Sequence, residues 1–145
     1  MQIIKRNICG LILLLSASTL VACQAQSALA AQDVVGPTID NIETSTKVMA
    51  KSDCNITSVT VTSNITDESG IKQAELWQRV GADQPYTPVT MSLTGGKYSV
   101  TVKALDVPGG EYGNWEFYIT AEDNAGNKSQ SPLDTTVQLL PCVGS

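Results

Sequence analysis

The sequence predicts an all-β fold, a single antiparallel β-sandwich of about seven strands. Short runs with a two-residue apolar period recur between residues 38 and 140. Clusters of Gly, Pro, Asn and Asp separate these runs, and no stretch has the period of an amphipathic helix. The chain has 145 residues with 42% hydrophobic content, which suffices for one domain after a leader. We therefore expect residues 37–145 to form one sandwich.

The stretch 114–127 is the best-defined element. Trp115, Phe117 and Ile119 alternate with polar residues, as in a strand with one face on a core and one toward water. The Asp-Asn-Ala-Gly-Asn that follows is dense in turn formers. This stretch holds the chain's single Phe and one of its 2 Trp, so we expect the core to be built against it.

The remaining expected strands, taken in order, show the same period. Residues 38–44 form the first expected strand, with Ile39 and Ile42 as its apolar contacts. Residues 71–80 form another, with Trp77 on the face opposite its core residues. Residues 87–93 and 97–105 flank a Thr-Gly-Gly turn and read as a hairpin, and Pro-Gly-Gly at 108–110 makes another turn. The other expected strands are 57–65 and 131–140, and the inward residues of 57–65, 71–80 and 131–140 are Val59, Val61, Ser63, Ile65, Ala74, Leu76, Val80, Val137 and Leu139.

The first 23 residues have the pattern of a signal peptide, with Lys5 and Arg6 ahead of an apolar run over 8–15 that is too short to span a membrane. The run is followed by Leu-Val-Ala-Cys at 20–23, which resembles the bacterial lipobox. That resemblance implies lipidation of Cys23 and a membrane anchor of two or three acyl chains. The chain would then sit on the outer face of the cell membrane or in the outer membrane. The alternative is cleavage after Ala30, which would secrete a soluble protein.

Residues 24–36 are rich in Gln, Ala and Ser and read as a flexible tether, with an Ala-rich helical extension as the alternative. Beyond the leader, the cysteines are Cys54 and Cys142. In an exported chain such a pair indicates a disulfide, which stabilises by at most about 4 to 5 kcal/mol on the chain-entropy model. Two unpaired buried thiols are the alternative.

Four motifs in order resemble the bacterial immunoglobulin-like and fibronectin-type-III-like modules of exported proteins. They are Gly-Pro-Thr-Ile at 36–39, Thr-Asp-Glu-Ser-Gly-Ile at 66–71, the hairpin at 91–98, and Tyr-Ile-Thr-Ala-Glu-Asp-Asn-Ala-Gly-Asn at 118–127. The resemblance covers about residues 36–142. It implies an immunoglobulin-like sandwich used as a spacer, stalk or binding module, and such modules are not usually enzymes.

Composition narrows the function further. The chain has no His, which removes the commonest general base and most zinc sites. Beyond the leader 7 basic residues stand against 14 acidic ones, a net charge of -7 without a basic run, so we expect no nucleic-acid partner. We expect no catalytic residues. The predicted role is binding or presentation on the envelope, through adhesion or a protein or glycan partner, and the alternative is a non-catalytic accessory subunit of an envelope complex.

Two groups of residues are candidate sites. The turns after the 57–65 and 114–123 strands should meet at one end of the sandwich, which would gather the oxygen ligands that calcium takes, from Asp67, Glu68, Asp123, Asn124 and Asn127. The alternative is that the aspartates cap their own turns and that Gly70 and Gly126 supply positive φ. Trp77 and Tyr118, both outward, could form an aromatic binding platform or pack across strands without a ligand. No cofactor is required, and calcium is the single candidate.

Overall fold

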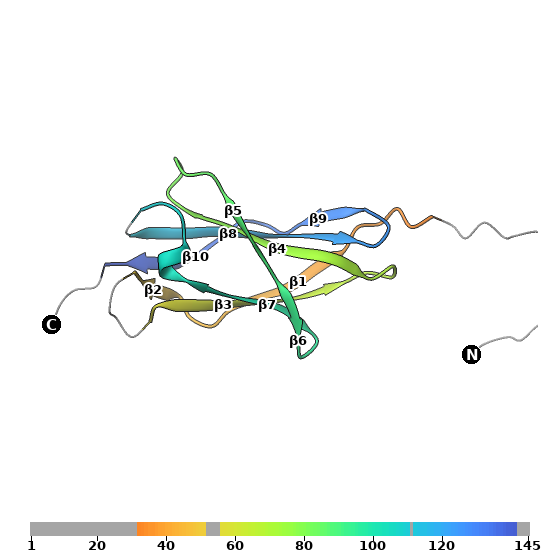
Figure 1. Ribbon diagram of the computed structural model, residues 1–145, viewed down its shortest axis with the longest axis horizontal. Coiled ribbons are helices and arrows are strands. Elements are labelled where there is room, and N and C mark those ends of the chain that lie inside the picture. The colour runs from red at the N-terminus through yellow and green to blue at the C-terminus, as the bar shows by residue number, and fades with distance from the viewer. Residues whose placement is uncertain (1–31, 52–55, 111, 142–145) are drawn as a thin grey trace, which may run out of the picture. The chain divides into compact units, whose positions relative to one another are not determined.

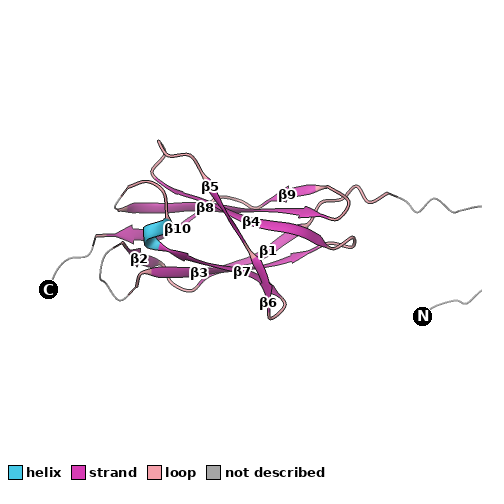
Figure 2. Cartoon of the chain, in the orientation of Figure 1, coloured by secondary structure: helices cyan, strands magenta, loops and turns pink. Residues whose placement is uncertain are grey.

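The computed structural model describes residues 32–51, 56–110 and 112–141. The chain divides into two compact units, Met1–Ala30 and Ala31–Ser145, and all described residues belong to the second. Strands account for most of this unit (Figure 2), and none of its described residues forms an α-helix. The elements are β1 Thr38–Thr44, β2 Val48–Ala50, β3 Ser58–Thr66, β4 Ile71–Val80, β5 Thr87–Thr90, β6 Ser92–Thr94, β7 Lys97–Lys103, the 3-10 turn η1 Ala104–Asp106, β8 Gly113–Asp123, β9 Lys128–Gln130 and β10 Asp134–Leu140.

The strands form two sheets that pack face to face (Figure 1). One sheet has four strands in the order β1-β3-β7-β6, and the other has six, in the order β2-β10-β8-β4-β5 with β9 added beside β8. The predicted all-β sandwich is therefore confirmed. Ten strands are present among the described residues where about seven were expected, because the three-residue strands are too short to show an apolar period. One of these, β2, pairs with β10 in parallel, so the sandwich is not wholly antiparallel.

The predicted strand 87–93 is split between the two sheets. Its first half, β5, pairs with β4 of the six-stranded sheet, and its second half, β6, pairs with β7 of the four-stranded sheet. In Figure 1 this green segment runs diagonally from one sheet to the other. Met91 lies at the crossing, where it is buried and its N–H donates to the carbonyl of Ala74. Met91 thus joins the core between the two half-strands, whereas Leu93 in β6 is exposed.

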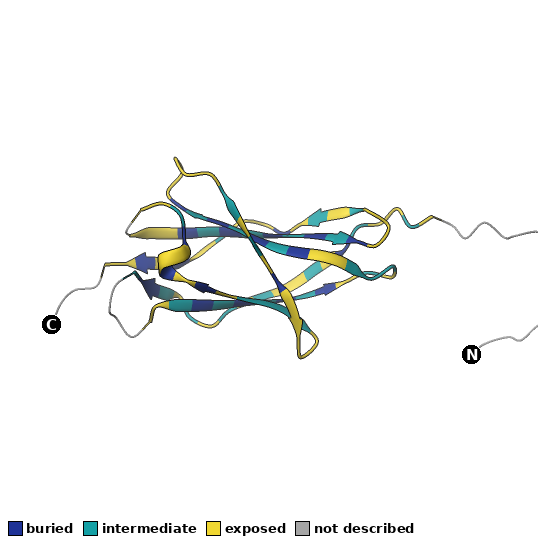
Figure 3. Ribbon diagram, in the orientation of Figure 1, coloured by how far each residue is buried: buried dark blue, intermediate teal, exposed yellow. Residues whose placement is uncertain are grey.

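The core lies between the sheets, and buried positions alternate with partly buried ones along β3, β4 and β8 (Figure 3). The predicted inward residues of β3, β4 and β10 are all buried, as the two-residue period required. Trp115 and Phe117 of β8 lie at the centre with ring centroids 4.5 Å apart. Gln78 of β4 also faces inward, where its Oε1 accepts a hydrogen bond of 3.0 Å from the indole N–H of Trp115. The expectation that the core is built on this strand is met.

Pairing of β4 with β8 brings two turns to the same end of the sandwich. Ile71 at the start of β4 lies opposite Asp123 at the end of β8. Asn124 then bridges the turns, because its backbone N–H donates to Gly70 and its side-chain amide donates to the carbonyl of Ser69. This end of the sandwich carries the candidate metal centre. Among the described residues no helix is long and apolar enough to cross a membrane.

Candidate metal centre and aromatic surface

The two acidic turns are held by their own aspartates. Oδ1 of Asp67 accepts from both the N–H and the hydroxyl of Ser69, at 2.8 and 2.7 Å. Oδ1 of Asp123 accepts from the N–H of Asn127 at 2.8 Å. Gly70 and Gly126 have φ of 85° and 94°, which glycine adopts without the steric cost of a Cβ. The capping role considered from the sequence is therefore present, and it leaves lone pairs on both carboxylates.

The structure brings together some of the five predicted calcium ligands and sets others apart. Asp67 and Asp123 meet, each offering a carboxylate oxygen to one compact group. Glu68 is exposed beside that group and is not part of it. Asn124 and Asn127 use their side-chain amides as hydrogen-bond donors, Asn124 to Ser69 and Asn127 to Oδ2 of Asp123 at 2.8 Å. The two asparagines thus brace the turns.

Asp33 completes the group, and sequence reasoning missed it. It lies in the predicted tether, yet its carboxylate joins those of Asp67 and Asp123 so that one oxygen from each lies within 4.8 Å of the others. Oδ1 of Asp33 accepts from the N–H of Val35, whereas Oδ2 is buried and has no hydrogen-bond partner. Asp33 is the one acidic residue between 24 and 36, and this could have marked it as a candidate ligand in the sequence.

The segment 33–36 is attached to the sandwich by contacts of its own. The side-chain amide of Asn127 donates to the carbonyls of Asp33 and Val35, each at 3.2 Å. Gly36 passes so close to β9 that a Cβ there would lie 2.7 Å from the hydroxyl of Ser129. The last residues of the predicted tether are therefore packed on the sandwich.

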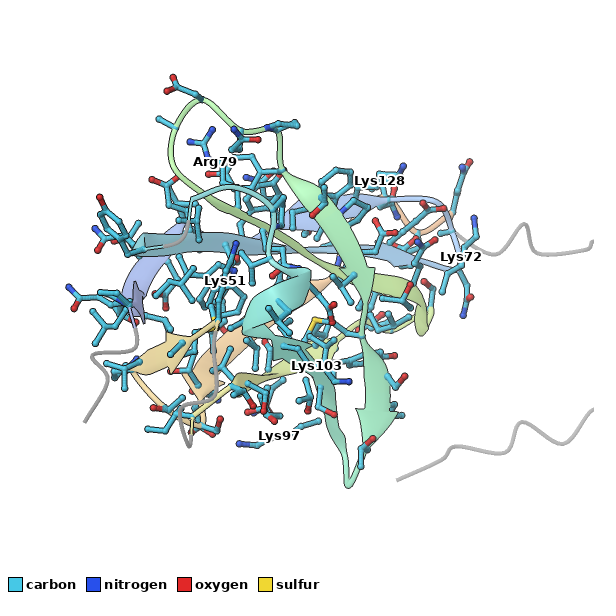
Figure 4. All side chains as sticks on the ribbon, turned by 60° about the vertical axis from the view of Figure 1, so that its left-hand side comes forward. Lys51, Lys72, Arg79, Lys97, Lys103 and Lys128 are labelled. Atoms are coloured by element: carbon cyan, nitrogen blue, oxygen red, sulfur yellow. The ribbon has the colours of Figure 1, made fainter. Side chains whose placement is uncertain are left out.

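The three carboxylates gather negative charge, and no basic side chain of residues 32–51, 56–110 and 112–141 forms an ion pair with them. Burial of Asp123 raises its pKa, but hydrogen bonds from the side chain and backbone of Asn127 and from the neighbouring backbone outweigh this and lower the pKa below its ordinary value. None of the ion pairs in the described part of the chain involves the three aspartates; the pairs are Lys72–Glu122, Arg79–Glu116, Lys97–Glu43 and Lys128–Glu122. Of the basic side chains labelled in Figure 4, Lys72 and Lys128 lie near each other, because both pair with Glu122.

A cavity of about 460 Å³ adjoins the acidic group. Asp33, Val35 and Gly36 line one side of it, and Asp67 and Glu68 line another. Two of the three clustered aspartates thus face a space that water can fill.

The predicted aromatic platform lies on the outward face of the six-stranded sheet. Trp77 of β4 and Tyr118 of β8 are cross-strand partners with parallel rings, 1° between planes and 6.2 Å between centroids. Tyr86 packs its edge against Tyr118 at 4.9 Å, and the guanidinium of Arg79 lies 4.3 Å above the Tyr86 ring. All three rings are half-buried. We call Trp77, Tyr118 and Tyr86 the aromatic surface.

Polar groups around the aromatic surface pair with one another. The indole N–H of Trp77 donates to the hydroxyl of Thr120 at 3.0 Å. Arg79 and Tyr86 both donate to Oε2 of Glu116, at 2.8 and 3.1 Å. The hydrogen bond from Arg79, helped by that from Tyr86 and opposed by burial, lowers the pKa of Glu116. The surface is thus pre-organised, with its rings held in place by neighbours on the sheet.

A separate apolar patch lies where β8 begins and β10 ends. Tyr112 and Leu140 are 69% and 42% exposed, and they line a cavity of about 210 Å³ together with Pro141. None of these three residues takes part in the ring contacts or hydrogen bonds of the aromatic surface.

The predictions about cysteines concern residues outside the described part of the chain. Cys23, Cys54 and Cys142 all lie there, so the lipid anchor and the disulfide stay predictions. No protein-family model matches this sequence, and a comparison with curated proteins finds no match either. The resemblance to immunoglobulin-like modules therefore rests on the sequence motifs alone.

Proposed function

We propose that this chain is an exported, lipid-anchored immunoglobulin-like module of the bacterial cell envelope, and that it acts in binding rather than catalysis. The observation that carries the binding role is the aromatic surface on the six-stranded sheet. Parallel Trp77 and Tyr118 rings, fixed by their neighbours, present aromatic area with little conformational entropy left to lose on binding.

A neutral glycan is the ligand class that this surface suits best. Sugar rings carry C–H faces that pack on aromatic rings, and hydroxyls that pair with polar groups at the edge. Thr120 and Glu75 lie directly beside the two rings on the sheet and supply such groups. The chain beyond its leader has a net charge of -7, which disfavours acidic polysaccharides.

Binding is tested with the full chain on an array of neutral and acidic glycans. Trp77→Ala and Tyr118→Ala should each lower the signal on neutral glycans about tenfold or more, because each removes one ring. Tyr112→Ala is the matched control, an exposed aromatic at another part of the surface. Equal signals for all variants would show that glycans do not bind at the aromatic surface. Binding to acidic glycans alone would show that the ligand is not a neutral glycan.

Anchoring is tested by labelling cells with radioactive palmitate. The full chain should take up the label, and Cys23→Ser should abolish it. An unlabelled chain found in the medium with Ala31 as its first residue would contradict the anchor and leave the secreted alternative.

A second candidate, the accessory subunit of an envelope complex, is favoured by the apolar patch of Tyr112, Leu140 and Pro141. Exposed apolar residues around a cavity are typical of protein contacts. Crosslinking on cells followed by mass spectrometry should then recover one stoichiometric partner. Tyr112→Ser should reduce that yield, whereas Trp77→Ala should leave it unchanged.

A further inference from the structure

We propose that Asp33, Asp67 and Asp123 bind one calcium ion, and that this ion fastens the segment preceding β1 to the end of the sandwich. The proposal does not depend on the lipid anchor or on glycan binding. It differs from the sequence prediction in its ligands, because Asp33 enters and the two asparagines become braces.

The acidic group alone would not point to an ion, since each aspartate of the turns has hydrogen-bond donors of its own. The independent observation is Oδ2 of Asp33, which is buried and has no partner. A buried carboxylate oxygen without a donor or a cation is costly, and here two more carboxylates lie beside it. A cation held by the three carboxylates would offset the repulsion among them and would compensate the carboxylate whose Oδ2 has no donor.

The spacing of the oxygens fits calcium. One oxygen from each aspartate lies within 4.8 Å of the others. Ligands on opposite sides of calcium, at 2.3–2.6 Å, lie at most about 5 Å apart, whereas those of magnesium lie about 4 Å apart. Three carboxylates leave several positions of calcium's shell open, and the adjoining cavity of about 460 Å³ provides space for water to fill them.

The position of Asp33 gives the ion a mechanical effect. Asp67 and Asp123 belong to turns of the sandwich, whereas Asp33 belongs to the chain that leads into β1. Without an ion, Asn127 holds that segment by two hydrogen bonds of 3.2 Å. A bound ion adds a ligand bond from the segment to the sandwich. How firmly residues 32–37 are held on the sandwich would then depend on calcium.

The first experiment titrates calcium into the metal-free full chain, purified in detergent, by isothermal titration calorimetry. We expect one site with Kd in the range of extracellular modules, about 0.1 to 1 mM. In 10 mM calcium the melting temperature should rise by roughly 5 °C relative to EDTA. Magnesium at the same concentration should give a smaller rise. An equal rise would overturn the assignment to calcium, and coincident curves in calcium and EDTA would overturn the site.

Asp33→Asn is the decisive variant. The carboxylate of Asp33 accepts one hydrogen bond, from the N–H of Val35, so replacing it leaves the hydrogen bonds of both turns intact. Calcium affinity should fall about tenfold or more, whereas the melting temperature in EDTA should equal or exceed that of the unaltered chain, because the neutral amide removes one of three repelling charges. Asp83→Asn, in the exposed loop after β4, is the matched control. Unchanged affinity in Asp33→Asn would remove this residue from the site.

Amide hydrogen exchange tests the fastening itself. Peptides covering residues 32–38 should exchange more slowly with calcium bound, and this protection should be lost in Asp33→Asn and kept in Asp83→Asn. If calcium binds with the expected affinity and exchange in 32–38 does not change, the ion sits elsewhere and the fastening is wrong.

Discussion

The hydrogen bond between Trp115 and Gln78 gives the sharpest prediction about stability. Among the residues that the structure describes, Gln78 is the largest buried polar side chain, 1% exposed, and Trp115 is fully buried beside it. The indole N–H donates to Oε1 of Gln78 at 3.0 Å. We consider Trp115→Phe, Gln78→Leu and the double variant, which removes both polar partners and leaves apolar side chains in their place.

The losses in free energy of unfolding of the two single variants should not add up to the loss of the double variant. Trp115→Phe leaves the amide oxygen unpaired, at about 1–3 kcal/mol, and loses packing worth about 1–2 kcal/mol. Gln78→Leu leaves the indole N–H unpaired, again at about 1–3 kcal/mol. In the double variant neither penalty remains, so its loss should be close to the packing loss alone. The double variant should therefore lose at least about 1 kcal/mol less than the sum of the single losses.

Urea unfolding followed by far-UV circular dichroism measures these losses, because the signal does not rely on the substituted Trp. The slope of free energy against urea should be the same for all four chains, so the midpoints report stability. If the two single losses add up to the double loss within about 0.5 kcal/mol, the reasoning is refuted, because Trp115 and Gln78 would then not be energetically coupled through their hydrogen bond.

The remaining predictions concern pH, a glycine and the disulfide. Because the folded pKa of Glu116 is lowered, chiefly by Arg79, its contribution is present above the unfolded value of about 4.3 and lost as pH falls through the folded value. Below pH 4.3 the stability of Glu116→Gln should thus fall less steeply than that of the unaltered chain, measured by urea unfolding. Gly109→Ala should cost about 2–4 kcal/mol on thermal unfolding, because φ is 108° and a Cβ would lie 1.9 Å from a carbonyl oxygen of β4. Non-reducing peptide mapping should recover Cys54 joined to Cys142, and two alkylatable thiols would contradict this.

Two controls separate causes in these experiments. Gly95→Ala has positive φ with nothing within 4 Å of the new Cβ, so its cost should be about 1 kcal/mol, from backbone conformation alone. Equal costs at the two glycines would show that the close approach to β4 does not matter. For Glu116→Gln, parallel acid curves with and without the substitution would remove the ion pair as the cause.

The fold class could be predicted from the sequence because a strand's two-residue period is local. The bounds of β1 and β4 agree with the predicted ranges 38–44 and 71–80, and the predicted inward residues of β3 and β10 are buried. Turn chemistry is equally local, so the positive φ of Gly70 and Gly126 followed from their motifs. Gln78 was missed on the inward face because its polar side chain breaks the apolar pattern that its position continues.

Tertiary structure alone decided the features that depend on distant partners. The chain crosses from one sheet to the other at Met91, and β2 pairs with β10, about 90 residues away. A local period contains neither fact. The same holds for the candidate metal centre. Asp33, Asp67 and Asp123 are separated by more than 30 residues in sequence at each step, and Asp33 lies in a stretch without strand pattern. Only the packing of that stretch against the turns brings its carboxylate to the other two.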